Sequence, residues 1–124
     1  MTQEVTSIEE FREIIDSSTW VTVVDFFATR CWPCKMLSPV MEELSEEHKD
    51  ITFLKVDVDE LPDLAWEYWV TAMPTIVFIK DWEVIDTVVW AYPKEVFEEK
   101  LANEEGQLRN NSLKDQVTWI SDEE

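Results

Sequence analysis

Residues 21–35, VTVVDFFATRCWPCK, decide the fold, because an apolar run leads directly into two cysteines. The first seven residues are mostly β-branched or aromatic, which predicts a strand buried on both faces of a sheet. After the cysteines, apolar residues recur at helical intervals among glutamates, and this pattern predicts an amphipathic helix to about Glu47. The cysteine pair therefore lies between a buried strand and the start of a helix.

Alternating helices and strands are predicted on both sides of this segment. Ser7 and Glu10 form a capping-box pattern, and apolar residues at helical spacing then predict a helix over 8–16. Downstream, the patterns predict a strand over 51–57, a short helix over 62–68, strands over 75–80 and 83–89 joined by an Asp81-Trp82 hairpin, and a helix over 93–101. This order combines parallel crossovers with an antiparallel hairpin. It predicts an α/β fold with a central mixed parallel and antiparallel sheet, flanked by helices on both faces.

Length and charge narrow the classes of function. The chain of 124 residues fits one domain, and its net charge of -18 argues against phosphate backbones and anionic membranes as partners, because counterion release needs a positive surface. We therefore expect neither nucleic acid nor a membrane as a partner. No apolar run approaches the roughly 20 residues of a membrane helix. The first ten residues lack the pattern of a secretory signal, so a cytoplasmic location is expected.

The character of the chain changes near Asn103. Residues 1–102 are predicted to form the folded domain, whereas residues 103–124 are polar and acidic and contain few apolar side chains. Termini with few apolar anchors tend to be poorly ordered. We therefore expect an acidic, polar C-terminal extension that is frayed or weakly docked.

Cys31 and Cys34 are the candidate catalytic residues. Backbone N–H groups and the dipole at a helix N-terminus favour negative charge, so the Cys31 thiol is expected to ionise more readily than an ordinary thiol. Lys35 adds a positive charge, and Pro33 fixes the backbone of the turn. Cys31 can then attack a substrate disulfide as a thiolate. Cys34, one helical turn on, can resolve the mixed disulfide.

Two other interpretations of the cysteine pair are weaker. A tetrahedral zinc site needs four ligands, but the chain holds two cysteines and one histidine, His48, which lies beyond the predicted helix. Two inert buried thiols are compatible with the spacing, although the strand–turn–helix setting favours redox chemistry. We expect no metal and no bound cofactor.

Four motifs in this order resemble the thioredoxin family. They are VVDFFATRCWPCK at 23–35, KVDVDE at 55–60, AMPTIVFIKD at 72–81 and EVIDTVVWAYP at 83–93. The resemblance spans about residues 6–101. It implies a thioredoxin fold and dithiol–disulfide exchange with disulfide-containing protein substrates. It also implies a monomer that is recharged by a flavoprotein, thioredoxin reductase.

The resemblance further implies roles for individual residues. Cys31 matches the family's nucleophile and Cys34 its resolving cysteine. Asp25 matches the buried aspartate that handles the proton of the resolving thiol, and Lys55 matches the lysine beside that aspartate. Pro74, after Met73, matches the cis-proline beside the active site in the family, and Pro39 matches the proline that kinks the active-site helix. The expected substrate contacts are Trp32, Pro33, Met73, Pro74 and Trp90.

The residue pattern agrees with the role implied for Asp25. This aspartate interrupts an apolar strand, and burial of a carboxyl group raises its pKa, which suits it to proton transfer. A purely structural, hydrogen-bonded aspartate is the alternative interpretation of the same position.

The sequence departs from the family mainly in its aromatic residues. Arg30 and Phe27 stand where the family usually has tryptophan. Tryptophan stands instead at four positions where the family usually has glycine: Trp32, Trp69, Trp82 and Trp90. Trp69 follows the end of a predicted helix and Trp82 lies in a predicted hairpin turn, where glycine is common because it adopts left-handed backbone angles. Trp90 ends a strand near the active site, where glycine lets a substrate backbone approach closely.

A positive φ in a bulky residue is a genuine outlier, and four exchanges of one kind in one small domain are systematic. The chain has one glycine against seven tryptophans. We therefore hypothesise that the gene uses the opal codon, UGA, for glycine. These positions would then be tryptophan only when the gene is translated with a code that reads UGA as tryptophan. Trp20 and Trp66 are weaker candidates for the same set. The alternative is a genuine tryptophan-rich variant.

The leading functional prediction is a thioredoxin-like protein-disulfide reductase. A disulfide oxidase or isomerase is one alternative, but those relatives tend to have histidine before the second cysteine, where Pro33 stands here. A binding or assembly module with little turnover is the other alternative, since Trp32 and Trp90 would crowd the substrate groove.

Overall fold

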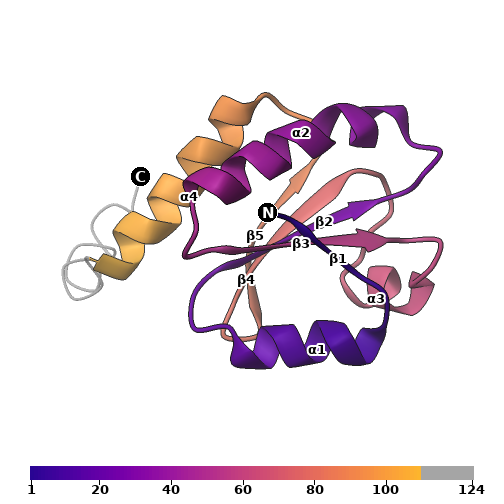
Figure 1. Cartoon of the computed structure of the whole chain (residues 1–124), viewed down its shortest axis with the longest axis horizontal. Helices are drawn as coiled ribbons and strands as arrows, with labels where there is room; N and C mark the ends of the chain where they lie inside the picture. The colour runs from indigo at the N-terminus through magenta and orange to yellow at the C-terminus, as the bar shows by residue number, and fades with distance from the viewer. Residues whose placement is uncertain (110–124) are drawn as a thin grey trace, which may run out of the picture. The chain divides into compact units, whose positions relative to one another are not determined.

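The computed structural model describes the backbone of residues 1–109 and the side chains of residues 1–104 (Figure 1). In chain order, its elements are β1 (Gln3–Val5), α1 (Ile8–Ser17), β2 (Thr22–Phe27), α2 (Trp32–Glu47), β3 (Thr52–Asp57), α3 (Pro62–Glu67), β4 (Thr75–Lys80), β5 (Glu83–Val89) and α4 (Lys94–Arg109). Met1–Tyr92 form one compact unit, and a second unit begins at Pro93 with α4. Most of the predicted C-terminal extension lies outside the described residues.

The first unit is built on a five-stranded sheet with the strand order β1-β3-β2-β4-β5. β1 and β2 run parallel to β3, whereas β4 is antiparallel to β2 and β5 is antiparallel to β4. The predicted mixed sheet is therefore confirmed. β2 lies at its centre and is paired along both edges, which explains its nearly continuous apolar sequence.

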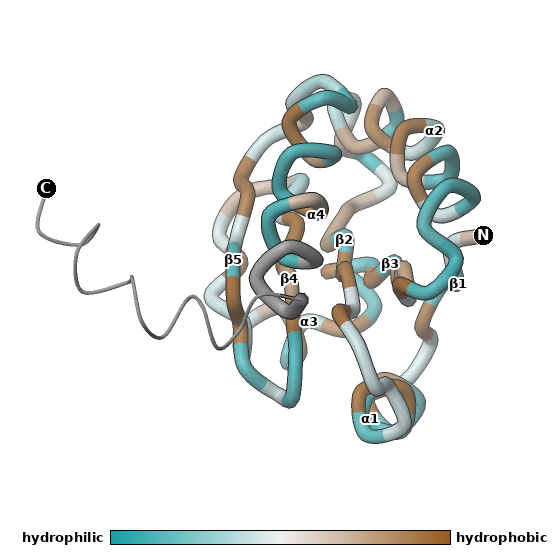
Figure 2. The backbone as a smooth tube through the Cα atoms, turned by 90° about the vertical axis from the view of Figure 1, so that its left-hand side faces the viewer, coloured by the Kyte–Doolittle hydropathy of each residue, from teal (hydrophilic) through white to brown (hydrophobic). Residues whose placement is uncertain are grey.

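Within this unit, helices lie on both faces of the sheet (Figure 1). α1 and α3 share a core cluster with one face, and its buried members are Val5, Phe11, Ile15, Val24, Phe26, Leu54, Val56, Leu64, Ala65, Val77 and Ile79. Each large side chain in it contributes about 1.5–3 kcal/mol by leaving water. Figure 2 shows brown, hydrophobic stretches in β4 and β5, which alternate with hydrophilic residues in β5. Successive residues of a strand point to opposite faces, so Asp25 points away from this cluster, toward the face that α2 covers.

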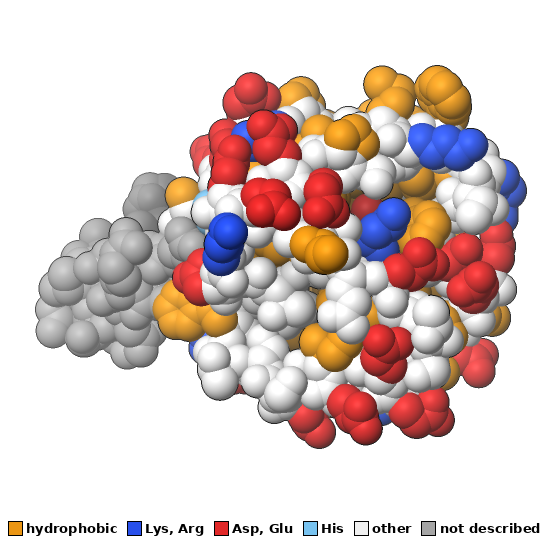
Figure 3. Space-filling model, in the orientation of Figure 1, with side chains coloured by type: hydrophobic (Ala, Val, Ile, Leu, Met, Phe, Trp, Pro, Cys, Tyr) orange, Lys and Arg blue, Asp and Glu red, His pale blue; other side chains and the backbone are white. Residues whose placement is uncertain are grey.

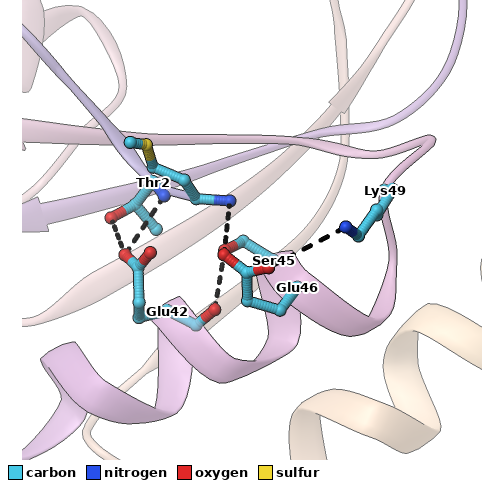
Figure 4. A network of polar contacts seen from close by, with 6 residues as sticks. Thr2, Glu42, Ser45, Glu46 and Lys49 are labelled. Carbon is cyan, nitrogen blue, oxygen red and sulfur yellow. Dashed lines mark hydrogen bonds and ion pairs between the residues drawn. The ribbon is translucent and has the colours of Figure 1, made fainter.

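Polar contacts fix the start of the chain to the C-terminal half of α2 (Figure 4). Glu42 accepts hydrogen bonds from the Thr2 hydroxyl at 2.7 Å and from the Thr2 backbone N–H at 3.2 Å. These two bonds lower the pKa of Glu42. Glu46 lies 3.5 Å from the Met1 ammonium group and 4.0 Å from the Lys49 ammonium group. The chain therefore enters β1 from an anchored position.

The predicted elements agree with the structure to within one residue, with two exceptions. The sequence does not predict β1, because three residues are too few to show a period. α4 continues to Arg109, beyond the predicted end at residue 101. The residues that extend it, ANEEGQLR, include strong helix formers, although the apolar period stops at Leu101.

Acidic side chains dominate the charged surface. Many Asp and Glu side chains and few Lys and Arg side chains are visible on the face shown in Figure 3. This distribution agrees with the net charge of -18. Among the described helices, none has the length and apolarity needed to cross a membrane.

The predicted capping box is present in an altered form. Ser7 is the N-cap of α1, and its hydroxyl accepts the Glu10 backbone N–H at 3.0 Å. The Glu10 carboxylate reaches back to the Thr6 backbone N–H at 2.9 Å, one residue earlier than the N-cap N–H of a regular capping box. The contact with Ser7 satisfies a backbone donor that the first turn of a helix leaves without a partner, whereas the contact with Thr6 ties the preceding residue to the helix.

Replacing Ser7 with alanine should leave the Glu10 N–H without its acceptor. We expect Ser7→Ala to lower the free energy of unfolding by about 1 kcal/mol, measured by urea denaturation. Thr19→Ala, at an exposed position between α1 and β2, is the matched control and should change this free energy by less than about 0.5 kcal/mol. Equal losses in the two variants would contradict the capping role of Ser7.

Candidate active site

Cys31 and Cys34 form a disulfide at the start of α2, with their Cα atoms 5.3 Å apart. Cys31 is the N-cap of the helix, and Trp32 and Pro33 are its first residues. Proline is tolerated there because N–H groups of the first turn have no helical acceptor. Since β2 ends at Phe27, the predicted sequence of strand, turn and helix is confirmed.

The start of α2 favours negative charge on the Cys31 sulfur. The Cys34 backbone N–H donates to that sulfur, with 3.2 Å between N and Sγ. The positive end of the α2 dipole lies at the same place. When the disulfide is reduced, both effects stabilise a thiolate at Cys31 relative to the thiol.

The two cysteines differ in their access to solvent. Cys34 is 4% exposed, whereas Cys31 is only half-buried. A second molecule can therefore reach the Cys31 sulfur far more easily than the Cys34 sulfur. This asymmetry gives the two thiols different tasks in any exchange reaction with a protein disulfide.

A cavity of about 470 Å³ is lined by the buried cysteine of the pair, Cys34, and by residues of β2, β3 and α2. Its lining residues are Asp25, Phe27, Ala28, Thr29, Cys34, Lys35, Ser38 and Lys55. The cavity thus connects the buried cysteine with the carboxyl group of β2 and an ammonium group of β3. It holds three of the four residues predicted to be catalytic, and the fourth, Cys31, is bonded to one of them.

Asp25 is a buried carboxyl group with an altered pKa. Its side chain is 2% exposed, and its Oδ1 atom has no hydrogen-bond partner among the described residues. Burial raises its pKa from the ordinary 3.8 to about 7, and the charge of Lys55 opposes this shift. The predicted rise in pKa is confirmed, and it allows Asp25 to gain and lose a proton near neutral pH.

Lys55 owes its position to strand register. Asp25 of β2 lies opposite Lys55 of β3 in the parallel pairing, so both side chains lie on the same face of the sheet. The Lys55 ammonium group also lies 4.8 Å from the centroid of the Phe27 ring, within the range of a cation–π contact. This contact places the cation in the cavity beside Asp25.

The sheet brings a second group of predicted residues to the same edge as the cysteine pair. The Met73-Pro74 peptide bond is cis, as the resemblance implies. Pro74 precedes β4, whose first residue pairs with Phe26 at the end of β2. The Trp90 backbone N–H donates to the Pro74 carbonyl at 3.0 Å, which fixes the end of β5 beside the cis-proline.

The predicted site residues therefore fall into two sets. Asp25, Lys55 and Cys34 line one cavity, whereas Met73, Pro74 and Trp90 lie at the sheet edge and do not line it. Trp32 is 68% exposed beside the disulfide. Pro39 lies within α2, as expected. Among the described residues, no group of three or more His, Cys, Asp or Glu side chains could hold a metal ion.

An ion pair beside Cys31 was not predicted from the sequence. Arg30, directly before Cys31, forms a salt bridge and hydrogen bond with Asp59. The Asp59 backbone N–H in turn donates to the buried Asp57 carboxylate at 2.9 Å. Carboxyl ends of neighbouring parallel strands meet at one edge, so the pairing of β2 with β3 is the signal that could have predicted this contact.

A half-buried and a buried cysteine form a disulfide at a helix start, and the buried one shares a cavity with a carboxyl group of raised pKa. This arrangement is typical of a dithiol–disulfide oxidoreductase. Comparison with known proteins identifies its family. The thioredoxin family model matches residues 2–103. The chain belongs to the thioredoxin family and is a thioredoxin-type protein-disulfide reductase.

Individual relatives support this assignment. The chain is 50% identical over 93 residues to thioredoxin H-type of Picea mariana, covering 75% of this chain and 73% of that protein. It is 46% identical over 89 residues to thioredoxin-2 of Pyricularia oryzae, covering 72% of this chain and about half, 52%, of that protein. The crystal structure of a Nicotiana alata thioredoxin matches with a TM-score of 0.79 and 38% identity, covering 83% of this chain and 91% of that one.

The raised pKa of Asp25 predicts a pH-dependent effect on stability. Between pH 4 and 7 the unfolded chain has released a proton that the folded chain still holds, so stability falls as the pH rises through this window. Asp25→Asn cannot ionise and loses this dependence. We expect the free energy of unfolding of Asp25→Asn, relative to that of the parent, to increase by a few kcal/mol at most between pH 4 and pH 7. Above pH 7 this difference should stay constant.

Urea denaturation of the oxidised protein at several pH values measures this difference. Asp50→Asn, an exchange of the same kind at an exposed position, is the matched control for the amide substitution itself. A constant difference between Asp25→Asn and the parent from pH 4 to pH 8 would show that Asp25 has an ordinary pKa.

Proposed function

We propose that Cys31 is the nucleophile and Cys34 the resolving thiol of a general reductase for protein disulfides. The asymmetry of the pair carries this proposal. Cys31 is accessible and its sulfur accepts the Cys34 N–H, whereas Cys34 is buried against the cavity. An incoming disulfide therefore meets Cys31 first, at the sulfur whose negative charge the helix start stabilises.

The exchange proceeds in two steps. The Cys31 thiolate attacks one sulfur of the substrate disulfide, which forms a mixed disulfide and releases the other substrate sulfur as a thiolate that takes up a proton. The Cys34 thiol then passes its proton to Asp25 and attacks the Cys31 sulfur. This attack forms the Cys31–Cys34 disulfide and releases the second substrate sulfur as a thiolate, which takes up a proton from water. Two electrons thus leave the enzyme for each substrate disulfide.

Asp25 is the proposed proton acceptor for Cys34. Both groups line the same cavity, and a pKa of about 7 lets the carboxylate accept a proton and release it again near neutral pH. Lys55 is the proposed partner of the ionised carboxylate, because its charge favours the ionised form of Asp25. The cavity offers room for water between these groups, through which the proton can pass.

The proposed substrate surface surrounds the Cys31 sulfur. Trp32 and Pro33 follow Cys31 in the chain, and the strand register brings Pro74 and Trp90 to the same sheet edge. Met73 precedes the cis-proline and is half-buried. We propose that these five positions contact the protein segment that carries the disulfide.

The proposed electron source is a thioredoxin reductase. Proteins of the thioredoxin family act on disulfide substrates and are reduced by such an enzyme, and we propose this cycle for a monomer in the cytoplasm. Pro33 before the second cysteine supports a reducing dithiol. We therefore expect a reduction potential near about -270 mV, whereas a value near -120 mV would indicate an oxidase instead.

Serine variants of the two cysteines test the assigned roles. Cys31→Ser should abolish insulin reduction, because no thiolate attacks the substrate. Cys34→Ser should instead accumulate a mixed disulfide with a protein substrate, since attack still occurs but resolution does not. Non-reducing electrophoresis and mass spectrometry detect the trapped species. Equal trapping by both variants would show that the nucleophile is wrongly assigned.

We also propose that residues 1–102 form the redox domain and that residues 103–124 are an acidic extension that the chemistry does not need. The family match over residues 2–103 supports this division, although α4 crosses the boundary. A chain that ends at Ala102 should reduce insulin at the same rate as the parent. Loss of activity without unfolding, followed by circular dichroism, would assign the extension a catalytic part.

A further inference from the structure

Left-handed backbone occurs at tryptophans in this chain. Four described residues other than glycine have positive φ, and three of them are tryptophan: Trp69 at 59°, Trp82 at 67° and Trp90 at 127°. The fourth is Asp81, at 54°. No described glycine has positive φ, and the one glycine of the chain, Gly106, lies within α4. Glycine adopts such angles freely because it has no Cβ atom, whereas a bulky residue there is an outlier.

Trp69 occupies the glycine position of a helix-ending motif. α3 ends at Glu67, and the following N–H groups turn back onto its carbonyls. The Trp69 N–H donates to the Trp66 carbonyl at 3.1 Å, and the Val70 N–H donates to the Ala65 carbonyl at 2.9 Å. These two bonds are the pair that defines a Schellman motif, whose left-handed residue is usually glycine.

Trp82 occupies the glycine position of a two-residue hairpin. Lys80 pairs with Glu83, so the loop between β4 and β5 consists of Asp81 and Trp82 alone. Both loop residues have positive φ. This combination is the type I′ turn, in which Asp followed by Gly is among the preferred sequences.

Trp90 is the most extreme of the three. Its φ of 127° lies well outside the small left-handed region, at about 50–70°, that residues with a Cβ atom reach. The hydrogen bond from the Trp90 N–H to the Pro74 carbonyl fixes this backbone beside the cis-proline. The neighbouring structure therefore demands the conformation whichever side chain is present.

Contacts of the indole rings do not offset this strain. Trp69 is 82% exposed, Trp90 is 52% exposed and Trp82 is 42% exposed. Trp82 donates to the Asp16 carboxylate at 2.8 Å, and the rings of Trp66 and Trp69 lie 6.5 Å apart, but both contacts are at the surface. Side chains that stay largely in water gain little from burial.

Of two further tryptophans, Trp20 fits its surroundings poorly and Trp32 lies largely in solvent. The Trp20 indole N–H is buried and has no hydrogen-bond partner among the described residues, which is unfavourable for a polar group. Trp32 stands between the two cysteines with 68% of its side chain exposed. Neither has positive φ, so they support the inference only through their side chains.

We infer that positions 69, 82 and 90 are glycine in the protein that the gene specifies, because the gene reads UGA as glycine. A single reassigned codon accounts for all three backbone outliers. It also accounts for the composition, one glycine against seven tryptophans, and extends the assignment to positions 32 and 20. Three unrelated substitutions to tryptophan would each have to place the residue where the backbone disfavours it.

One consequence concerns the active site and rests on the proposed substrate surface. With glycine at positions 32 and 90, the backbone on either side of the Cys31 sulfur would be free of large side chains. An extended protein segment could then approach the end of β5 and the cis-proline closely. Positions 32 and 90 would thus determine whether a protein disulfide, rather than a small one, reaches Cys31.

The codons give the most direct test. In the coding sequence we expect UGA at positions 69, 82 and 90, and tryptic peptides of the protein from its source should have masses with glycine at these positions. A UGG codon at any of the three positions, or tryptophan in the peptides, would overturn the inference. Trp66, Trp69 and Trp82 would then be a genuine aromatic surface.

Thermal denaturation tests the backbone argument separately. Trp69→Gly and Trp82→Gly should raise Tm by about 4 °C or more, while Trp69→Ala and Trp82→Ala should not, because alanine removes the ring but keeps the Cβ atom. Trp66, inside α3, is the matched control, and there glycine should give a lower Tm than alanine. If the glycine variants at positions 69 and 82 had a Tm no higher than that of the alanine variants, the inference would be contradicted.

Activity assays test the consequence for substrates. The double variant Trp32→Gly and Trp90→Gly should show a larger relative gain in kcat/KM for insulin than for a small aliphatic disulfide. Equal gains would show that the rings do not control access. If the parent and the double variant both failed to reduce insulin, the proposed function would fail, whereas the codons and the melts would still decide the inference.

Discussion

The pairing of β2 along both of its edges is the constraint on which the rest of the structure depends. On one side, the register with β3 sets Lys55 beside Asp25. On the other side, the antiparallel β4 brings the cis-proline to the end of β2, from which the cysteine turn departs. Residues from distant parts of the chain therefore meet at one end of the sheet, beyond the last residues of β2, because this single strand is paired on both sides. A slip of one residue would move Asp25 to the opposite face and dismantle the site.

The buried carboxyl group shows how stability and function oppose each other. Asp25 lies in the central strand, and its Oδ1 atom has no hydrogen-bond partner among the described residues. This buried polar atom lowers the stability of the fold, whereas an apolar residue at the same position would not. The same burial raises the pKa of Asp25 to about 7, and this value suits the group to the proton transfer that we propose beside Cys34. The surrounding sheet and core cluster supply the stability that tolerates it. A position that violates local preferences inside an otherwise consistent fold is expected to belong to a functional site.

Local patterns predict most of this fold but not its long-range contacts. The strand–turn–helix unit around Cys31 follows from the apolar run of the strand and the apolar period of the helix. The direction of the pKa shift of Asp25 follows from its place in an apolar strand. The short β1 escapes prediction because its stability comes from pairing with β3 and not from its own sequence. The contact between Arg30 and Asp59 depends on two strand ends meeting, which no local pattern encodes. The cis geometry before Pro74 follows from family resemblance alone.

The tryptophans extend this reasoning to the identity of the residues themselves. The hydrogen bonds that close α3, the two-residue loop after β4 and the bond onto the Pro74 carbonyl all involve backbone atoms. None of them needs an indole ring, so the left-handed angles are set by the fold and not by the side chains. A backbone determined in this way constrains which residue can occupy a position without strain. Where several positions violate that constraint with one and the same residue, a shared cause in the reading of the gene explains more than separate adaptations of the protein.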